Sequence, residues 1–186
     1  NVPKSLEKIL HSLKESGYDV GDIPDDIDGE KIVTYLKQLS QEDIICRGID
    51  HARGKFDDNL RNELGAKIHG TDMVAEQLKE YITFDETWGP NEWGPLPFLP
   101  SPDILVNKME AAWGDISKYR AGLSTTTSGN AVVSGLRFGN VFIGVQPLLG
   151  VEGDPMRLLF ERDLTPHPQY AAFYKWLEHD FKADAV

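Results

Sequence analysis

The sequence predicts an α/β fold, in which a mostly parallel sheet is flanked by helices and carries a small helical insertion. Residues 141–145 are apolar on both faces, which is typical of an interior strand of a parallel sheet that helices cover. Residues 168–181 have the spacing of an amphipathic helix, and residues 183–186 are expected to begin another strand. A strand, a helix and a strand in this order indicate a βαβ unit.

The chain opens with a strongly signalled helix. Pro3 suits the first turn of a helix, and Gly17 suits its end. Between them, apolar residues recur at helical spacing at Leu6, Ile9, Leu10 and Leu13. The turn at Ile23-Pro24 then separates this helix from the next part of the chain.

Residues 25–85 are predicted to form a small helical insertion with charged outer faces. Its first helix has apolar residues at helical spacing at Ile32, Tyr35, Leu36 and Leu39. A second helix is expected to begin at the sequence Ser40-Gln41-Glu42-Asp43, which resembles a capping box. A third helix, within residues 73–82, places Val74, Leu78 and Tyr81 on one face.

The segment that follows is rich in tryptophan and proline, so residues 86–100 are expected to form a loop. A helix over residues 102–113 comes next, with Ser101 as N-cap and Gly114 as its end. Residues 124–129, of low complexity, are expected to be mobile, and residues 131–134 are expected to form a strand.

These elements suggest a division of the chain into a core and an insertion. Residues 1–24 and 101–186 are assigned to the α/β core, and residues 25–100 to the helical insertion and the loop. Residue 1 is not a methionine, and residues 183–186 look like the beginning of a strand. We therefore expect the chain to be a piece of a larger multidomain protein.

The composition argues against several classes of partner. The formal net charge of the 186 residues is −11, which disfavours non-specific binding to nucleic acids or to anionic membranes. No apolar run approaches the length of a membrane span, and the first residues do not resemble a signal peptide. Cys46 is the single cysteine, so an intrachain disulfide and a cysteine-rich metal site are excluded.

Four polar side chains follow the predicted strand 141–145, where open α/β sheets bind their ligands. Gln146 supplies an amide, Glu152 and Asp154 supply two carboxylates, and Arg157 supplies a fixed positive charge. Spacing alone favours a structural explanation, in which Asp154 before Pro155 caps a short helix. The catalytic interpretation stays open beside it, because loop carboxylates mark functional sites only statistically.

His167 lies between two prolines at the beginning of the predicted helix 168–181. The positive end of a helix lowers the pKa of a histidine and favours the neutral ring, which accepts a proton or binds a metal. The alternative is a solvated or hydrogen-bonding cap in a turn that the prolines shape. The sequence supports both interpretations equally.

Residues 48–56 resemble a phosphate-binding loop only superficially. Five residues instead of four separate Gly48 and Gly54, and Phe56 stands after Lys55 where a serine or threonine would hold Mg²⁺. We therefore do not expect this chain to hydrolyse ATP.

Two stretches carry a resemblance to a known family. RFGNVFIGVQP, GVEGDPMRLLF and FYKWLEHDFKADAV, within residues 137–186, resemble the large porphyrin-binding subunits of the magnesium chelatase and cobaltochelatase family almost position by position. A weaker resemblance covers residues 1–24. The sequence EGDPMR is similar to the magnesium branch, whereas ERDLTPHPQYAAFYKWL has features of the cobalt branch.

The resemblance implies a function for the parent protein. Such a subunit binds protoporphyrin IX and receives Mg²⁺ as a substrate, while ATP is hydrolysed on separate AAA+ partner subunits, in the bacterial cytoplasm or the plastid stroma. On this basis Glu152 is expected to deliver Mg²⁺ or to accept a pyrrole proton, with Asp154 as a second metal ligand. His167 would be a second base or an orienting group, Arg157 would pair with a propionate, and Gln146 would contact the substrate.

Two other functions remain open at this point. The parent protein could be the large subunit of a cobaltochelatase, which serves cobalamin synthesis. Alternatively, the chain could be a non-catalytic docking segment whose acidic insertion binds the ATPase subunits.

Overall fold

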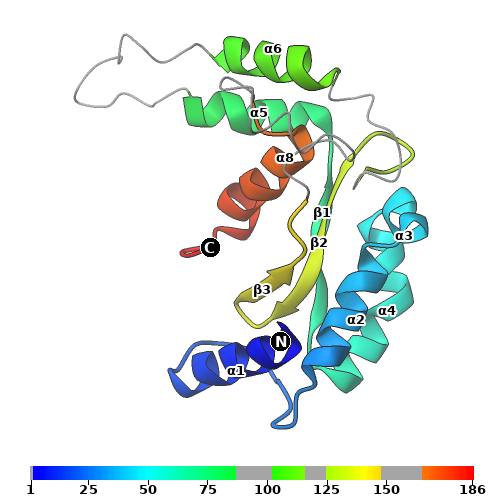
Figure 1. The fold of residues 1–186 in the computed structure, drawn as a ribbon, viewed down its shortest axis with the longest axis vertical. Coiled ribbons are helices and arrows are strands. Elements are labelled where there is room, and N and C mark those ends of the chain that lie inside the picture. Colours follow the sequence, from blue (N-terminus) through cyan, green and yellow to red (C-terminus); the bar gives the residue numbers. More distant parts are fainter. Residues whose placement is uncertain (1, 87–101, 116–124, 148–164) are drawn as a thin grey trace. The chain divides into compact units, whose positions relative to one another are not determined.

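The computed structural model describes residues 2–86, 102–115, 125–147 and 165–186, and combines helices with one small sheet (Figure 1). The chain forms two compact units. Unit 1 comprises Asn1–Asp72 and Val132–Val145, and unit 2 comprises Met73–Ala131 and Gln146–Val186. Each unit combines residues from the predicted core with residues from the predicted insertion. The two units therefore follow other boundaries, and the predicted division into a core and an insertion stays a prediction.

The described part of unit 1 contains four helices: α1 (Val2–Glu15), α2 (Gly29–Leu39), α3 (Glu42–Arg47) and α4 (Ile49–Glu63). The prediction of the first helix is confirmed, with Leu10 fully buried and Gly17 following at a φ of +85°. The predicted helix around Ile32 is confirmed as α2, which Asp28 caps by accepting a hydrogen bond from the backbone N–H of Glu30 at 2.9 Å.

The capping box predicted at Ser40 is wrong, although a helix does begin nearby. Gln41 is the N-cap of α3, and its side chain makes no capping hydrogen bond. The Ser40 hydroxyl instead donates to the carbonyl of Leu36 at 2.9 Å, at the end of the preceding helix. Gly54 lies inside α4, so the segment that superficially resembles a phosphate-binding loop is mostly helix.

The described sheet has the strand order β1-β2-β3, with β1 (Lys67–Met73), β2 (Ala131–Phe138) and β3 (Val141–Gly144). The predicted mostly parallel sheet is wrong, because these three strands form an antiparallel sheet (Figure 1). β2 and β3 pair from Phe138↔Val141 to Gly135↔Gly144. The turn at Gly139-Asn140 connects them, and the φ of +56° at Gly139 suits a tight hairpin.

The strands predicted over residues 131–134 and 141–145 both exist, but the second lies in a different environment from the expected one. Residues 141–144 are all half-buried, and β3 is the last strand in the order of the described sheet. Their apolar character therefore does not indicate an interior strand. Val141 and Ile143 pack on the core, and the ring of Phe142 lies over Gly135, where a Cβ atom would meet the ring at 2.5 Å.

β1 was not predicted, because its sequence KIHGTDM is mostly polar and lies within the expected helical insertion. Gly70 permits the strand at this place. Its φ is +155°, and a Cβ atom there would lie 1.8 Å from the carbonyl oxygen of Val133 in β2. The core of unit 1 joins all four helices to β1 and β2, through residues that include Leu10, Ile32, Ile44, Leu60, Ile68 and Phe138.

The described part of unit 2 contains three α-helices, α5 (Ala75–Glu86), α6 (Pro102–Trp113) and α8 (Pro168–Trp176), and a π-helical turn, η2 (Leu177–Phe181). The predicted helices over 73–82, 102–113 and 168–181 are confirmed, except that Val74 precedes α5 and is 41% exposed. Gly114 follows α6 with a φ of +90°. Ser101 lies outside the described residues, as do most of residues 86–100.

The strand expected over residues 183–186 is absent from the described structure. Lys182 follows η2 in the left-handed region with a φ of +57°, and residues 183–186 form no regular element. The described residues therefore do not form the predicted βαβ unit. In the same ranges, no helix has both the length and the apolar character needed to cross a membrane.

Candidate functional site

The structure describes two of the five predicted site residues. Glu152, Asp154 and Arg157 lie within residues 148–164, outside the described residues. Gln146 is exposed and lies two residues after the end of β3, whereas His167 is buried at the beginning of α8. Within the described residues, no hydrogen bond, ion pair or ring contact joins Gln146 and His167. The site is therefore built here from His167 and its neighbours in unit 2.

His167 is the N-cap of α8. Its side chain is 5% exposed, and its extended backbone turns the chain from Pro166 into Pro168, the first residue of the helix. Its Nδ1 atom accepts a hydrogen bond from the backbone N–H of Gln169 at 3.3 Å. This is the hydrogen-bonding cap that the sequence offered as the structural alternative, while a chemical role of His167 stays a prediction.

The protonation state of His167 follows from burial and from the capping bond. Burial lowers the pKa of the ring, because the charged form loses its hydration. The ring is therefore neutral near neutral pH. Since Nδ1 accepts a hydrogen bond, Nε2 carries the proton of the neutral ring.

Trp113, the last residue of α6, contacts the same region. Its ring meets the ring of His167 edge-on, at 5.1 Å between centroids and 67° between planes. Its indole N–H donates to the carbonyl of Thr165 at 2.9 Å. One aromatic side chain thus contacts both His167 and the backbone two residues earlier.

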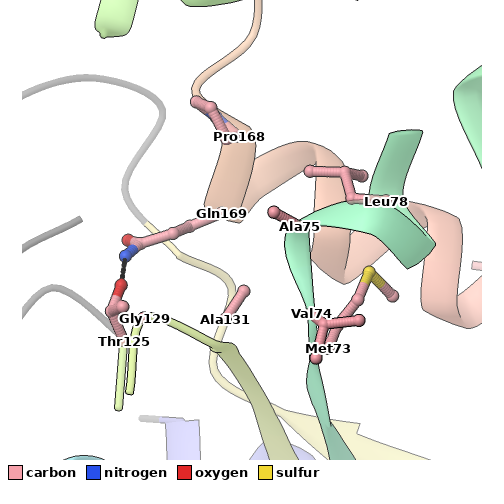
Figure 2. A pocket seen from close by; sticks show the side chains of 9 residues that line it. All are labelled: Met73, Val74, Ala75, Leu78, Thr125, Gly129, Ala131, Pro168 and Gln169. Atoms are coloured by element: carbon pink, nitrogen blue, oxygen red, sulfur yellow. Dashed lines mark hydrogen bonds between the residues drawn. The ribbon is translucent and has the colours of Figure 1, made fainter. Parts of the chain in front are cut away.

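A buried hydrogen bond joins the first turn of α8 to the segment before β2. The side-chain amide of Gln169 donates to the hydroxyl of Thr125, and the two residues are 7% and 1% exposed (Figure 2). Thr126 is also buried, and its hydroxyl accepts from the backbone N–H of Asn130 at 3.0 Å. The expectation that residues 124–129 are mobile is wrong for Thr125 and Thr126, which are packed and hydrogen-bonded.

A small pocket lies beside this hydrogen bond (Figure 2). Apolar side chains form most of its wall, and the Gln169 and Thr125 side chains form its polar end. It is lined by Met73, Val74, Ala75, Leu78, Thr125, Gly129, Ala131, Pro168 and Gln169. The pocket has room for about one water molecule, so it is far too small for a large planar ligand.

Three members of this cluster were not predicted from the sequence: Trp113, Thr125 and Gln169. A glutamine in the first turn of a largely apolar helix was the available signal, because a buried amide requires a partner. Its partner lies 44 residues earlier in the chain, at a separation that helical and strand periodicity do not detect. Among the described residues, no group of three or more histidine, cysteine or acidic side chains could hold a metal ion.

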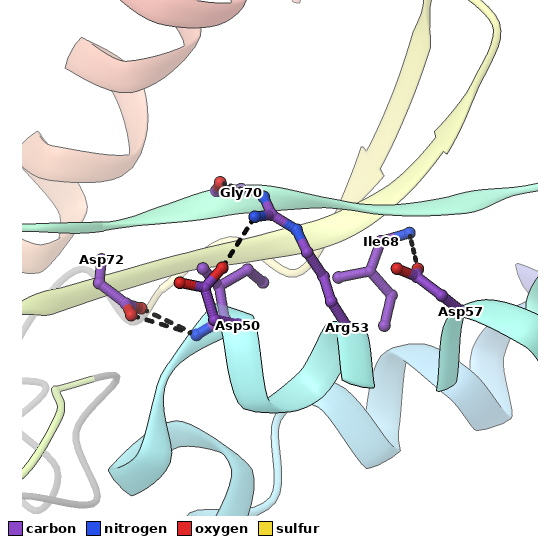
Figure 3. Close-up of polar contacts among 7 residues, drawn as sticks. Asp50, Arg53, Asp57, Ile68, Gly70 and Asp72 are labelled. Carbon is purple, nitrogen blue, oxygen red and sulfur yellow. Dashed lines mark hydrogen bonds and ion pairs between the residues drawn. The ribbon is translucent and has the colours of Figure 1, made fainter. Parts of the chain in front are cut away.

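A second polar cluster, in unit 1, holds α4 against β1 (Figure 3). The carboxylate of Asp72 accepts from the backbone N–H of Ile49 at 3.0 Å, at the beginning of α4. Arg53 donates to the carbonyl of Gly70 at 3.1 Å and pairs with Asp50 at 2.9 Å. Burial raises the pKa of Asp72, against the effect of its bond to Ile49. These contacts are structural.

Comparison with known proteins identifies the family of this chain. The CobN/Magnesium Chelatase family matches residues 1–186, the whole chain. The chain is 31% identical over 186 residues to the magnesium-chelatase H subunit of Rhodobacter capsulatus, covering 100% of the chain and 12% of that protein. It is 32% identical over 187 residues to the chloroplastic magnesium-chelatase subunit ChlH of Oryza sativa subsp. japonica, covering 100% of the chain and 10% of that protein.

A cobaltochelatase matches a shorter part of the chain. The aerobic cobaltochelatase subunit CobN of Pseudomonas aeruginosa is 45% identical over 58 residues, which cover 31% of the chain and 5% of that protein. The chain spans about a tenth of the length of the magnesium-chelatase subunits that it matches throughout. Because the family matches every residue, this chain belongs to the CobN/Magnesium Chelatase family.

Proposed function

We propose that this chain is a segment of a magnesium-chelatase H subunit and takes part in the ATP-dependent insertion of Mg²⁺ into protoporphyrin IX. The observation that carries the proposal is the match of the entire chain to several proteins named as this subunit, from bacteria and from a chloroplast. The reaction forms nitrogen–metal bonds, and it would belong to the synthesis of chlorophyll or bacteriochlorophyll. The protein would act in the bacterial cytoplasm or the plastid stroma.

The reaction makes two chemical demands that the predicted site residues meet. Two pyrrole N–H protons must leave, and Mg²⁺ must lose part of a tightly held hydration shell in exchange for other ligands. Glu152 and Asp154 supply the oxygen ligands that Mg²⁺ prefers, and Glu152 can also accept a proton. Arg157 would pair with a propionate, and Gln146 would contact the porphyrin.

His167 would act in this scheme as an orienting hydrogen-bond donor. Its Nδ1 atom accepts from Gln169, so the proton of the neutral ring lies on Nε2. In that tautomer Nε2 donates a hydrogen bond and does not accept a proton. Of the two roles considered for His167, the geometry therefore favours the orienting group over the second base.

ATP hydrolysis is assigned to AAA+ partner subunits. Residues 48–56, the one segment with some likeness to a phosphate-binding loop, lack the required spacing and lie mostly in α4. The energy of ATP would reach this subunit through contacts with its partners.

Cobalt insertion is the second candidate. The observation that favours it is the 45% identity to the cobaltochelatase subunit of P. aeruginosa over 58 residues, but the magnesium-chelatase H subunit of Cereibacter sphaeroides is also 45% identical, over 78 residues. The cobaltochelatase match covers 31% of the chain, whereas the magnesium-chelatase subunit of R. capsulatus matches all of it. The magnesium assignment is therefore the better supported of the two.

The test is the substitution Glu152→Gln in the full-length subunit, assayed with its partner subunits. Removing the carboxylate charge while keeping the side-chain shape is expected to lower the rate of Mg²⁺ insertion by about 100-fold or more. Porphyrin affinity, followed by tryptophan fluorescence quenching, is expected to stay unchanged. Glu178→Gln, at an exposed position in η2, is the matched control.

Two results would contradict the assignment. Unchanged turnover of the Glu152→Gln subunit would remove Glu152 from the reaction. A wild-type subunit that binds no porphyrin and inserts no metal would overturn the proposed function itself.

A further inference from the structure

We propose that Gln169 is a positioning residue for His167, holding its ring in one tautomer and one orientation through a buried hydrogen bond to Thr125. The inference rests on the proposed function, because His167 is taken to orient a reacting group during metal insertion. Gln169 itself would touch neither the porphyrin nor the metal. Its effect would pass entirely through the first turn of α8.

The backbone of Gln169 selects the tautomer. Its N–H group donates to Nδ1 of His167 at 3.3 Å, so a proton on Nδ1 would face another donor. The neutral ring avoids that repulsion by carrying its proton on Nε2. This selection requires the backbone N–H of Gln169 to stay where the first turn of α8 places it.

The side chain of Gln169 fixes that first turn. Its amide donates to the hydroxyl of Thr125, across 44 residues of sequence, and both groups are almost completely buried (Figure 2). A buried amide without a partner is costly, so the two groups strongly favour the arrangement in which they meet. The polar pair thus defines one position for the beginning of α8 against the apolar wall of the neighbouring pocket.

Trp113 restricts the imidazole ring from another element. The edge-on contact between the two rings comes from the last residue of α6, and the same indole group holds the carbonyl of Thr165. His167 is therefore contacted both by α6 and by the first turn of α8. A ring restrained in this way directs its Nε2–H along one line, which is what an orienting donor requires.

The experiment uses the full-length subunit with its partner subunits and compares three substitutions. Gln169→Met keeps the length of the side chain and removes the amide, whereas Thr125→Val removes the hydroxyl. Thr125→Ser keeps the hydroxyl, so it should keep the wild-type rate of metal insertion that Thr125→Val loses. The matched control is Gln77→Met, which removes the 2.7 Å bond from another side-chain amide to the hydroxyl of Tyr81 in the same unit.

Both Gln169→Met and Thr125→Val are expected to lower kcat of metal insertion by about tenfold or more, because small misplacements of an orienting group cost up to about 100-fold in rate. KM for the porphyrin is expected to stay near the wild-type value. The double variant should lose no more than either single variant, because both changes remove the same bond. Gln77→Met should leave kcat unchanged.

A second measurement does not depend on activity. Diethyl pyrocarbonate acylates neutral imidazole nitrogens, and mass spectrometry identifies the modified histidine. His167 is expected to react faster in Gln169→Met than in the wild type or in Gln77→Met, because its ring is no longer held.

The outcomes separate the two proposals. Metal insertion by the wild type together with an unchanged kcat in Gln169→Met would overturn the positioning role and leave the proposed function intact. If the losses of kcat simply parallel losses of melting temperature, and Gln77→Met shows a similar loss, the hydrogen bond stabilises the fold and has no positioning role. A wild-type subunit that inserts no metal would overturn the proposed function, and the positioning role with it.

Discussion

At the scale of single residues, burial sets the protonation state of His167. Burial is the cause of its lowered pKa, and a nearby positive charge is not required to explain it. The same loss of hydration lowers the pKa of His69 in β1, where Arg137 and Arg53 add to the effect. Each compact unit therefore contains a histidine that folding keeps neutral.

These shifts predict how stability depends on pH. The unfolded chain binds protons at His167 and His69 as the pH falls through about 6.5, whereas the folded chain binds them at these two residues only at lower pH. The histidine contribution to stability is thus fully present above that pH and declines as the pH falls toward the lowered pKa of the folded state. His167→Asn keeps a good N-cap and removes the titration.

The measurement is urea denaturation at several pH values on both sides of about 6.5. His167→Asn should lose less stability than the wild type as the pH falls. Part of the dependence should remain, because His69 is still present. Identical pH dependence in the two proteins would contradict the assignment of a lowered pKa to His167.

At the scale of elements, the contact between α4 and β1 shows how polar side chains replace missing backbone partners. β1 is one of the two edge strands of the described sheet, and an open strand edge needs covering. Asp57 accepts from the backbone N–H of Ile68 at 3.2 Å, and Arg53 donates to the carbonyl of Gly70 (Figure 3). In turn, the carboxylate of Asp72 in β1 caps the beginning of α4 by accepting a hydrogen bond from the backbone N–H of Ile49.

Removing that cap should destabilise unit 1. Asp72→Ala leaves the backbone N–H of Ile49 without its carboxylate acceptor, and we expect a loss of about 1 kcal/mol in the free energy of unfolding. The matched control is Asp58→Ala, at an exposed position of α4. Equal stability of the two variants in chemical denaturation would show that Asp72 does not act as a cap.

The elements also show which parts of the fold could be predicted from sequence. Helices α6 and α8 begin at prolines and α1 has Pro3 as its second residue, so their positions depend on local signals that the sequence displays. The sheet depends on contacts between distant segments. The sequence of β1 is mostly polar, so it lacks the apolar alternation by which strands are predicted, and the strand is instead bonded to α4 through its backbone. The turn at Gly139-Asn140 was a usable hairpin signal that indicated antiparallel pairing.

The candidate site likewise contains features that local sequence signals predict and features that depend on contacts between distant segments. His167 between two prolines was visible as a helix cap, because a cap is a local feature. The buried pair of Gln169 and Thr125 was not, because it depends on how unit 2 folds. The roles of Glu152, Asp154 and Arg157 come from the family resemblance and remain predictions.

At the scale of the whole molecule, each unit is built from separate stretches of chain. The β2–β3 hairpin, which comes late in the sequence, belongs to unit 1. Unit 2 contains α5 and α6, which precede that hairpin in the sequence, and α8, which follows it. Neither unit could therefore be obtained by cutting the chain once. Variants are best tested in the full-length subunit, of which this chain covers about a tenth in its relatives.

The proposed function also provides the last prediction, which concerns the choice of metal by the full-length subunit. The predicted ligands Glu152 and Asp154 are carboxylates, which suit a hard cation such as Mg²⁺, whereas heavier divalent metals bind imidazole and thiolate ligands more readily. We expect the full-length subunit, supplied with ATP and its partner subunits, to insert Mg²⁺ into protoporphyrin IX in preference to Co²⁺. Absorbance spectra of the metalloporphyrin products distinguish the two metals. Preferential insertion of Co²⁺ under the same conditions would favour the cobaltochelatase assignment. The 58-residue match to the P. aeruginosa subunit would then indicate the function better than the matches that cover the whole chain.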